Sequence, residues 1–449
     1  DFGHAVAING NTVIVGSPDH SAGGPESGAA YIYTKHSEKW IKQVKLIDIV
    51  SSSEDEFGYS VAITDKTAVV GSRQDDRRGI NTGSVYVYVS LTDDKGETRW
   101  DKQSVLTADD AAVGAQFGHS VAVDKDTILV GAHGMDDAGI DSGAAYLFVK
   151  TSDVWNQQAK ISGTGIATGD LFGCSVAING DLAIVGAHGA NQEAGAAFIF
   201  VRDNATWRQQ AKLEANDSTP GDAFGYSVAV HQQTVIVGAP KNDVVGTDAG
   251  AAYVFVQQGE KWIQQAKLIA ADAAIGDQFG IAVTTEKDTA IVGAWLDDIA
   301  EPEIGAAIDA GSAYVFIRQK ENWSQQTKFI ADEPGVEDHF GLVVALNDLA
   351  VVVGAPDRDT IEGKDDPPIP STGSVYSFAR AGEFWSPAIL ATISEGSMPY
   401  DRFGGTIGMS DRSIIVGIHG DDSAGKDAGA VFIFDYVDFG LEVDPEPFS

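Results

Sequence analysis

In this chain of 449 residues the dipeptide Phe-Gly marks eight units of a repeat that covers the whole sequence. In each of the eight units a second glycine follows the Phe-Gly glycine after 13 residues. The paired glycines are Gly3 and Gly16, Gly58 and Gly71, Gly118 and Gly131, Gly173 and Gly186, Gly225 and Gly238, Gly280 and Gly293, Gly341 and Gly354, and Gly404 and Gly417. Such self-similarity is the signature of a repeat fold, in which each unit stacks on its neighbours.

The pattern within each unit predicts β-strands. In the fifth unit, "YSVAV" and "TVIVG" are β-branched runs separated by a short polar turn, and two other units place Asn-Gly at this turn (residues 9–10 and 179–180). Asn-Gly between apolar runs is the strongest short hairpin signal. "AAYVFV" and "KWIQQAKL" supply two further strands, the last with the alternation of a half-exposed strand. Helical periodicity is absent.

Four strands per unit, repeated radially, predict an all-β fold, a β-propeller built from four-stranded blades. The whole chain, 1–449, is one domain, and we predict eight blades, with seven as the alternative. The predicted blades are 1–55, 56–115, 116–170, 171–222, 223–277, 278–338, 339–401 and 402–449. The eighth unit lacks the tryptophan that marks the fourth strand, so we expect a degenerate outer strand around Leu441. The first unit is complete, so no blade should combine both ends of the chain.

The combination "FG…VGA…GAAY…W" resembles the FG-GAP repeat family and is more distantly similar to the propeller of integrin α subunits. This resemblance covers the whole chain and implies a β-propeller in an extracellular or cell-surface setting, as in adhesion proteins. Integrin-type calcium loops lie between the first and second strands. Here those turns read "TDK", "DKD", "QQ" and "SDR", which are too short and too poor in ligands to carry that site.

The charge of the chain restricts its partners. It carries 30 basic and 65 acidic residues, a net charge of −35, which repels nucleic acid and anionic membranes. No apolar run approaches the length of a transmembrane helix, so no membrane insertion is expected, and no signal peptide is recognised. The single cysteine, Cys174, occupies a repeat slot filled elsewhere by His4 or Tyr59, and we interpret it as a structural thiol.

Most of the acidic residues fall in two sets of loops that should open on the same face. These are the loops between the second and third strands and those leading into the next blade. Oxygen-rich loops suit Ca²⁺, so calcium is a candidate cofactor. The alternative is that each aspartate caps a turn with its own side chain. The candidate ligands are Asp75, Asp76, Asp136, Asp137, Asp141, Asp222, Asp277, Asp297, Asp298, Asp421, Asp422 and Asp427.

No catalytic motif stands out, and we do not expect an enzyme. His133, His188 and His419 share a slot that other units fill with Pro, Arg or Trp, so a shared metal role is disfavoured. The long loops 294–310 and 355–372 break the repeat symmetry, and any substrate pocket should lie beside them. Three glycosylation sequons begin at Asn204, Asn216 and Asn322.

The leading hypothesis is therefore an extracellular propeller that binds a protein or glycan ligand through its acidic face, with calcium assisting. One alternative is a structural subunit of an extracellular filament or sheath that self-associates through its terminal blade. Another is a polysaccharide lyase or hydrolase with its site near the long loops. Fold alone does not choose among them.

Overall fold

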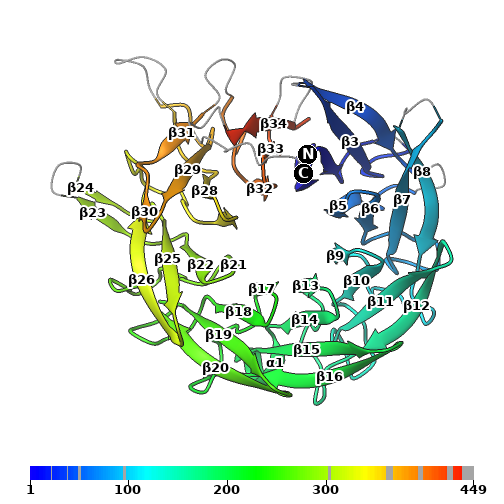
Figure 1. Ribbon diagram of the computed structural model, residues 1–449, viewed down its shortest axis with the longest axis horizontal. Coiled ribbons are helices and arrows are strands. Elements are labelled where there is room, and N and C mark those ends of the chain that lie inside the picture. The colour runs from blue at the N-terminus through cyan, green and yellow to red at the C-terminus, as the bar shows by residue number, and fades with distance from the viewer. Residues whose placement is uncertain are drawn as a thin grey trace.

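The computed structural model describes residues 1–21, 23–37, 39–48, 52–94, 98–301, 305–360, 368–392, 398–421 and 428–436. Eight antiparallel sheets stand around a ring (Figure 1), which confirms the all-β propeller and the count of eight blades. Each blade runs outward from its first strand in simple meander order. Among the described residues, no helix is long and apolar enough to cross a membrane.

The first four blades are regular four-stranded meanders. Their strands are β1 (Ala5–Asn9), β2 (Thr12–Ser17), β3 (Ala29–His36) and β4 (Lys39–Leu46); β5 (Phe57–Ile63), β6 (Thr67–Ser72), β7 (Ser84–Thr92) and β8 (Thr98–Leu106); β9 (Ser120–Asp124), β10 (Thr127–Ala132), β11 (Ala144–Thr151) and β12 (Val154–Ile161); and β13 (Val176–Asn179), β14 (Leu182–Ala187), β15 (Ala196–Asp203) and β16 (Thr206–Leu213). One short helical turn, α1 (Ala190–Glu193), follows β14, with left-handed backbone at Asn191 and Gln192.

The last four blades carry the irregular features. Their strands are β17 (Val228–His231), β18 (Thr234–Ala239), β19 (Ala251–Gln258) and β20 (Lys261–Leu268); β21 (Val283–Glu286), β22 (Thr289–Ala294), β25 (Ser312–Gln319) and β26 (Asn322–Phe329), with the added hairpin β23 (Ile299–Glu301) and β24 (Gly305–Ala307); β27 (Val343–Leu346), β28 (Ala350–Ala355), β29 (Ser374–Ala381), β30 (Phe384–Trp385) and β31 (Ile389–Ala391); and β32 (Thr406–Met409), β33 (Ser413–Ile418) and β34 (Ala430–Asp435). The outer strand of blade 7 is split at Ser386–Ala388 into β30 and β31.

The ring closes through contacts between blade 8 and blade 1. In the described part of the chain, no blade combines strands from both ends of the sequence. All four strands of blade 1 come from the N-terminal unit, and β32, β33 and β34 come from the C-terminal unit, as predicted. The outer strand expected around Leu441 lies outside the described residues. Phe2 and Gly429 form a parallel bridge between blades 1 and 8, and the Thr406 hydroxyl donates to the Gly3 carbonyl over 2.7 Å.

The repeated glycines explain how neighbouring blades approach so closely. At every interface the Phe of one Phe-Gly pair bridges the glycine that precedes the third strand of the previous blade, as Phe172 bridges Gly143. A Cβ on Gly143 would lie 2.1 Å from the Phe172 carbonyl oxygen, and the φ of Gly143 is +83°. We call this contact the Phe-Gly clip. It requires glycine both for space and for conformation.

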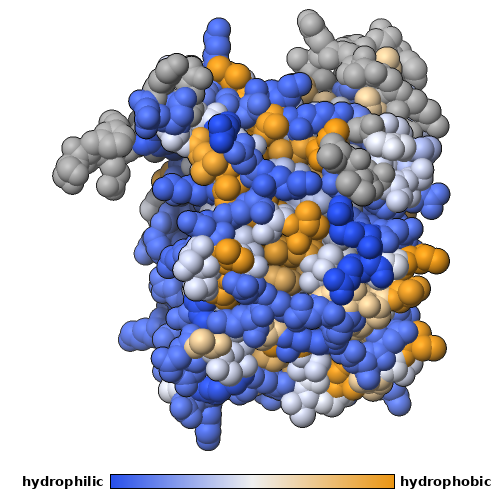
Figure 2. All heavy atoms as spheres, turned by 90° about the vertical axis from the view of Figure 1, so that its right-hand side faces the viewer, coloured by the Kyte–Doolittle hydropathy of each residue, from blue (hydrophilic) through white to orange (hydrophobic). Residues whose placement is uncertain are grey.

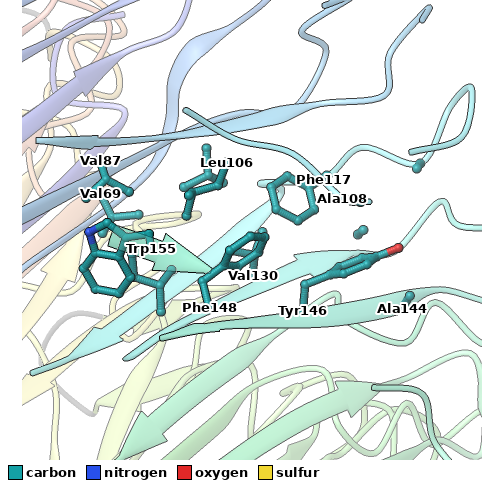
Figure 3. Close-up of a cluster of buried hydrophobic side chains, with 14 of the residues drawn as sticks. Val69, Val87, Leu106, Ala108, Phe117, Val130, Ala144, Tyr146, Phe148 and Trp155 are labelled. Carbon is teal, nitrogen blue, oxygen red and sulfur yellow. The ribbon is translucent and has the colours of Figure 1, made fainter. Parts of the chain in front are cut away.

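The core fills the spaces between adjacent sheets. Between blades 2 and 3, Val69, Val87 and Leu106 pack in one buried cluster with Phe148 and Trp155 (Figure 3). The second and third strands are buried along most of their length, whereas the outer strands are largely half-buried with some exposed positions. Each interface therefore has its own apolar core, in the manner of a repeat protein.

Tryptophan and glutamine connect the outer strands of successive blades. The indole Nε1 of Trp207 donates to Gln158 Oε1 of the previous blade over 2.8 Å. The same bond at 2.8 Å joins Trp155 to Gln103, Trp262 to Gln210, Trp323 to Gln265 and Trp385 to Gln326. Elsewhere the outer wall is mainly hydrophilic with scattered apolar side chains, as the side that carries β8 and β12 shows (Figure 2).

Candidate functional site

Two sets of loops meet on one side of the ring, which we call the loop face. It consists of the loops between the second and third strands of each blade and the loops that lead into the next blade. The two sets are joined by backbone hydrogen bonds, as from Gly114 N to Ile80 O (3.0 Å) and from Gly169 N to Ile140 O (2.8 Å). Every candidate calcium ligand among the described residues belongs to these loops.

The aspartates that precede Phe-Gly cap turns. Asp222 accepts hydrogen bonds from the Thr219 backbone N (2.9 Å) and from the Asn242 amide (2.8 Å). Asp277 accepts one from Ala274 N at 2.7 Å. Burial raises the pKa of Asp277 to about 6, with a smaller contribution from the nearby charge of Asp297. The side chains of Asp222 and Asp277 therefore hold the backbone of their own loops.

The aspartate pairs divide into two roles. One aspartate of each pair contacts a tyrosine or a lysine, as Asp297 accepts from the Tyr314 hydroxyl (2.7 Å) and pairs with Lys328 (2.7 Å). Asp75 likewise contacts Tyr86, and Asp137 pairs with Lys160. The other aspartate of the pair, which is the second in 75–76 and 297–298 but the first in 136–137, accepts a hydrogen bond from a backbone N–H farther along the same loop. These bonds join Asp76 to Asn81 (2.7 Å), Asp136 to Asp141 (2.8 Å) and Asp298 to Asp309 (2.9 Å).

No three histidine, cysteine, aspartate or glutamate side chains converge into a metal-holding group within the described part of the chain. Asp421 is buried in the last described loop, whereas Asp422 and Asp427 lie outside the described residues. The geometry favours turn capping for the described aspartates, and calcium stays a prediction. Asn204, Asn216 and Asn322 are all exposed, and their glycosylation also stays a prediction.

An arc of aromatic rings lies next to the inner strands. Its members are the residues that directly follow Phe-Gly or Gly-Ala in successive units. The ring centroids of His4 and Tyr59 are 5.1 Å apart, and those of Tyr59 and His119 are 5.4 Å apart. His133 lies against His119 at 4.0 Å. Burial lowers the pKa of His119 to about 3, with His133 and Arg73 adding to the effect, so its imidazole is neutral at physiological pH.

Cys174 lies in the same arc. Its Sγ is 3.2 Å from Nδ1 of His188, and burial raises the pKa of the thiol. A buried thiol with a raised pKa is poorly nucleophilic, which agrees with the structural role expected from the sequence.

Blades 7 and 8 interrupt this arc with a charged group. Asp357 accepts hydrogen bonds from Nδ1 of His339 (2.8 Å) and from Nε of Arg402 (2.7 Å). Burial raises the pKa of Asp357, but the bonds from His339 and Arg402 outweigh it and hold that pKa below its usual value. These residues line a cavity of about 650 Å³ beside the long loop 355–372. His339 and Arg402 fill the position before Phe-Gly, where other units have Asp, Glu, Gln, Leu or Ala. This difference was the sequence signal for the site.

The loop face also carries exposed apolar side chains. Ten large hydrophobic side chains in the described residues are more than half exposed, and eight of them lie on this face. Seven are aliphatic, and we call them the apolar row: Ile80, Val113, Ile140, Val245, Ile275, Ile308 and Val336. The sequence analysis missed them because single apolar residues in glycine-rich loops give no periodic signal.

Comparisons with solved structures show similarity of fold alone. Two crystal structures of Sqt1 from Chaetomium thermophilum align with TM-scores of 0.57, at 14% and 13% identity. The alignments cover 97% and 96% of this chain and 96% and 94% of those chains. No curated protein sequence matches the chain.

The comparison with sequence families is informative over almost the whole length. The FG-GAP repeat family matches residues 1–33, 40–88, 100–148, 155–200, 207–255, 262–316, 323–378 and 393–434. The eight matched segments equal the blades in number but are offset from them, since segments two to seven each begin in the outer strand of one blade and end in the third strand of the next. The chain belongs to the FG-GAP repeat family.

Proposed function

We propose that this chain is an extracellular binding module that docks a protein partner on its loop face. The apolar row is the observation that supports the proposal. Exposed aliphatic side chains gathered on one face are typical of protein interaction surfaces, whereas scattered single ones are not. Because the row runs over loops of blades 2, 3, 5, 6 and 7, a broad partner surface can contact several blades at once.

The charge around the apolar row defines the partner further. The loops that carry it also carry most of the 65 acidic residues, so a partner with basic residues around an apolar centre would complement it. The extracellular setting rests on the family, whose repeats are typical of extracellular proteins. Adhesion to a matrix protein is the role that combines these properties.

Surface plasmon resonance against immobilised collagen, fibronectin and laminin tests the proposal. A triple variant, Ile80→Ser, Ile140→Ser and Ile275→Ser, should lose about tenfold or more in affinity for any protein that binds. The matched control carries Val154→Ser and Phe384→Ser, which change exposed apolar residues of the outer wall. The proposal fails if none of the three proteins binds, or if the triple variant binds as well as the control.

Calcium is a separate element of the proposal. Its ligands would come from the longer loops of the loop face, where carboxylate and carbonyl oxygens are abundant. About 1 mM CaCl₂ should raise Tm more than NaCl of equal ionic strength. Equal shifts with the two salts would mean that general screening, and not a calcium site, accounts for the effect.

A further inference from the structure

Two cavities adjoin on the loop face of blade 7. The first, of about 650 Å³, is lined by His339, Asp357 and Arg402. The second, of about 480 Å³, is lined by Arg358 and Thr360 among others. Val336 and Asp359 line both cavities, so the two form one elongated groove from the mouth of the ring towards its rim. An elongated groove suits a chain-like ligand better than a compact one.

The floor of this groove is fixed before any ligand binds. Asp357 is engaged by both His339 and Arg402, and Asp359 Oδ1 accepts a hydrogen bond from Ser371 N at 2.9 Å. Because its Nε is held by Asp357, Arg402 can offer its terminal amino groups as donors. His339 uses Nδ1 towards Asp357, which leaves Nε2 for a ligand. Donors and acceptors therefore alternate along a preorganised surface.

An exposed aromatic ring stands at the edge of the groove. The side chain of Tyr400 is 64% exposed, and its backbone N–H donates to Pro370 O at 2.9 Å, which ties it to the loop that forms the opposite wall. Aromatic side chains give a rigid, amphipathic contact surface with a polar end. A ring beside alternating donors and acceptors matches the apolar face and the hydroxyl rim of a pyranose.

We propose that the blade 7 groove binds a neutral oligosaccharide. The acidic lining opposes an acidic glycan, because Glu333, Glu337 and Asp359 line the groove on its exposed side. Apart from Leu390 of β31, the described residues that line the groove lie in loops, which offer little of the strand ladder that would bind an extended peptide. The groove shares Val336 with the apolar row, whereas the row's residues over blades 2, 3 and 5 lie outside it.

Isothermal titration calorimetry with maltotetraose, cellotetraose, mannotetraose and N-acetylchitotetraose tests the groove. At least one of these neutral tetrasaccharides should bind, and Tyr400→Ala should weaken its binding about tenfold through loss of ring contact. Tyr400→Phe keeps the ring and should retain most of the affinity. Phe384→Ala is the matched control, since Phe384 is a 77% exposed aromatic residue on the outer wall.

Three outcomes would overturn the proposal. They are absence of binding by all four neutral tetrasaccharides, equal affinity of Tyr400→Ala and wild type, and tighter binding of tetragalacturonate than of any neutral probe. Since Ile80, Ile140 and Ile275 lie outside the groove, the triple serine variant should bind the oligosaccharide normally. Failure of the groove and failure of the protein-docking surface are therefore distinguishable.

Discussion

Gly143 and Gly165 have the same backbone conformation, with φ of +83° at both, but different surroundings. A Cβ on Gly143 would meet the Phe172 carbonyl oxygen at 2.1 Å, whereas a Cβ on Gly165 would have nothing within 4 Å. Gly165→Ala should therefore cost only the conformational strain, about 1 kcal/mol. Gly143→Ala must also open the Phe-Gly clip and should cost about 3 kcal/mol or more. Chemical denaturation of both variants gives the comparison, and equal losses would contradict the steric role of the clip.

The buried carboxyl of Asp277 gives a pH-dependent prediction. Its pKa in the folded chain is raised to about 6, so the folded state binds a proton more tightly than the unfolded state does. Its contribution to stability is thus fully present below its unfolded pKa and is lost as the pH rises through about 6. From about pH 7 to pH 5, wild type should gain about 1 to 2 kcal/mol relative to Asp277→Asn.

Thermal denaturation at the two pH values measures this gain. Asp65→Asn, which replaces an exposed aspartate in a turn on the opposite face, is the control and should differ from wild type equally at both. A pH-independent difference for Asp277→Asn would mean that this carboxyl keeps the same pKa on unfolding.

At the level of strands, the tryptophan–glutamine bonds offer an internal comparison. Gln158 accepts from the buried Trp207 indole, so Gln158→Leu should leave a buried donor unpaired and cost about 1 to 2 kcal/mol. Gln43 occupies the same place in blade 1, but the Trp100 indole has no hydrogen-bond partner among the described residues. Gln43→Leu should therefore cost much less. A similar loss in both variants, measured by urea denaturation, would show that glutamine acts there through packing alone.

Over the whole molecule, the net charge of −35 opposes the compact state through self-repulsion. Raising NaCl from about 0.02 M to about 0.5 M at neutral pH should raise Tm by about 2 °C or more. Near pH 4.5, close to the pI of about 4.3, the same change in salt should have little effect. A salt response of equal size at both pH values would indicate that screening of the net charge is not its cause.

The features predicted correctly are those encoded within one unit. The glycine spacing recurs eight times, and the hairpin signals and outer tryptophans lie close to it in sequence, so all-β blades and their number followed from the pattern. Some contacts of the loop aspartates depend instead on side chains that are distant in sequence. Asp110, for example, accepts from the Tyr146 hydroxyl at 3.0 Å across 36 residues, and no local pattern announces that contact. A cavity does lie beside the long loop 355–372, which breaks the repeat symmetry. The contacts of Asp357 with His339 and Arg402, however, join three loops that are separate in sequence.

The Phe-Gly clip has a consequence for how many blades the ring contains. The same parallel bridge occurs at all eight interfaces, including the one between the first and last units. Each interface thus sets the same rotation of one blade relative to the next, and the ring closes only when these rotations sum to a full turn. The number of blades is therefore set by the rotation between neighbouring blades, and the chain only has to be long enough to contain that number of repeat units. If equivalent substitutions changed this rotation slightly at every interface, the deviations would add up around the ring. Their sum would have to be absorbed between blades 8 and 1, where Phe2 must still contact Gly429.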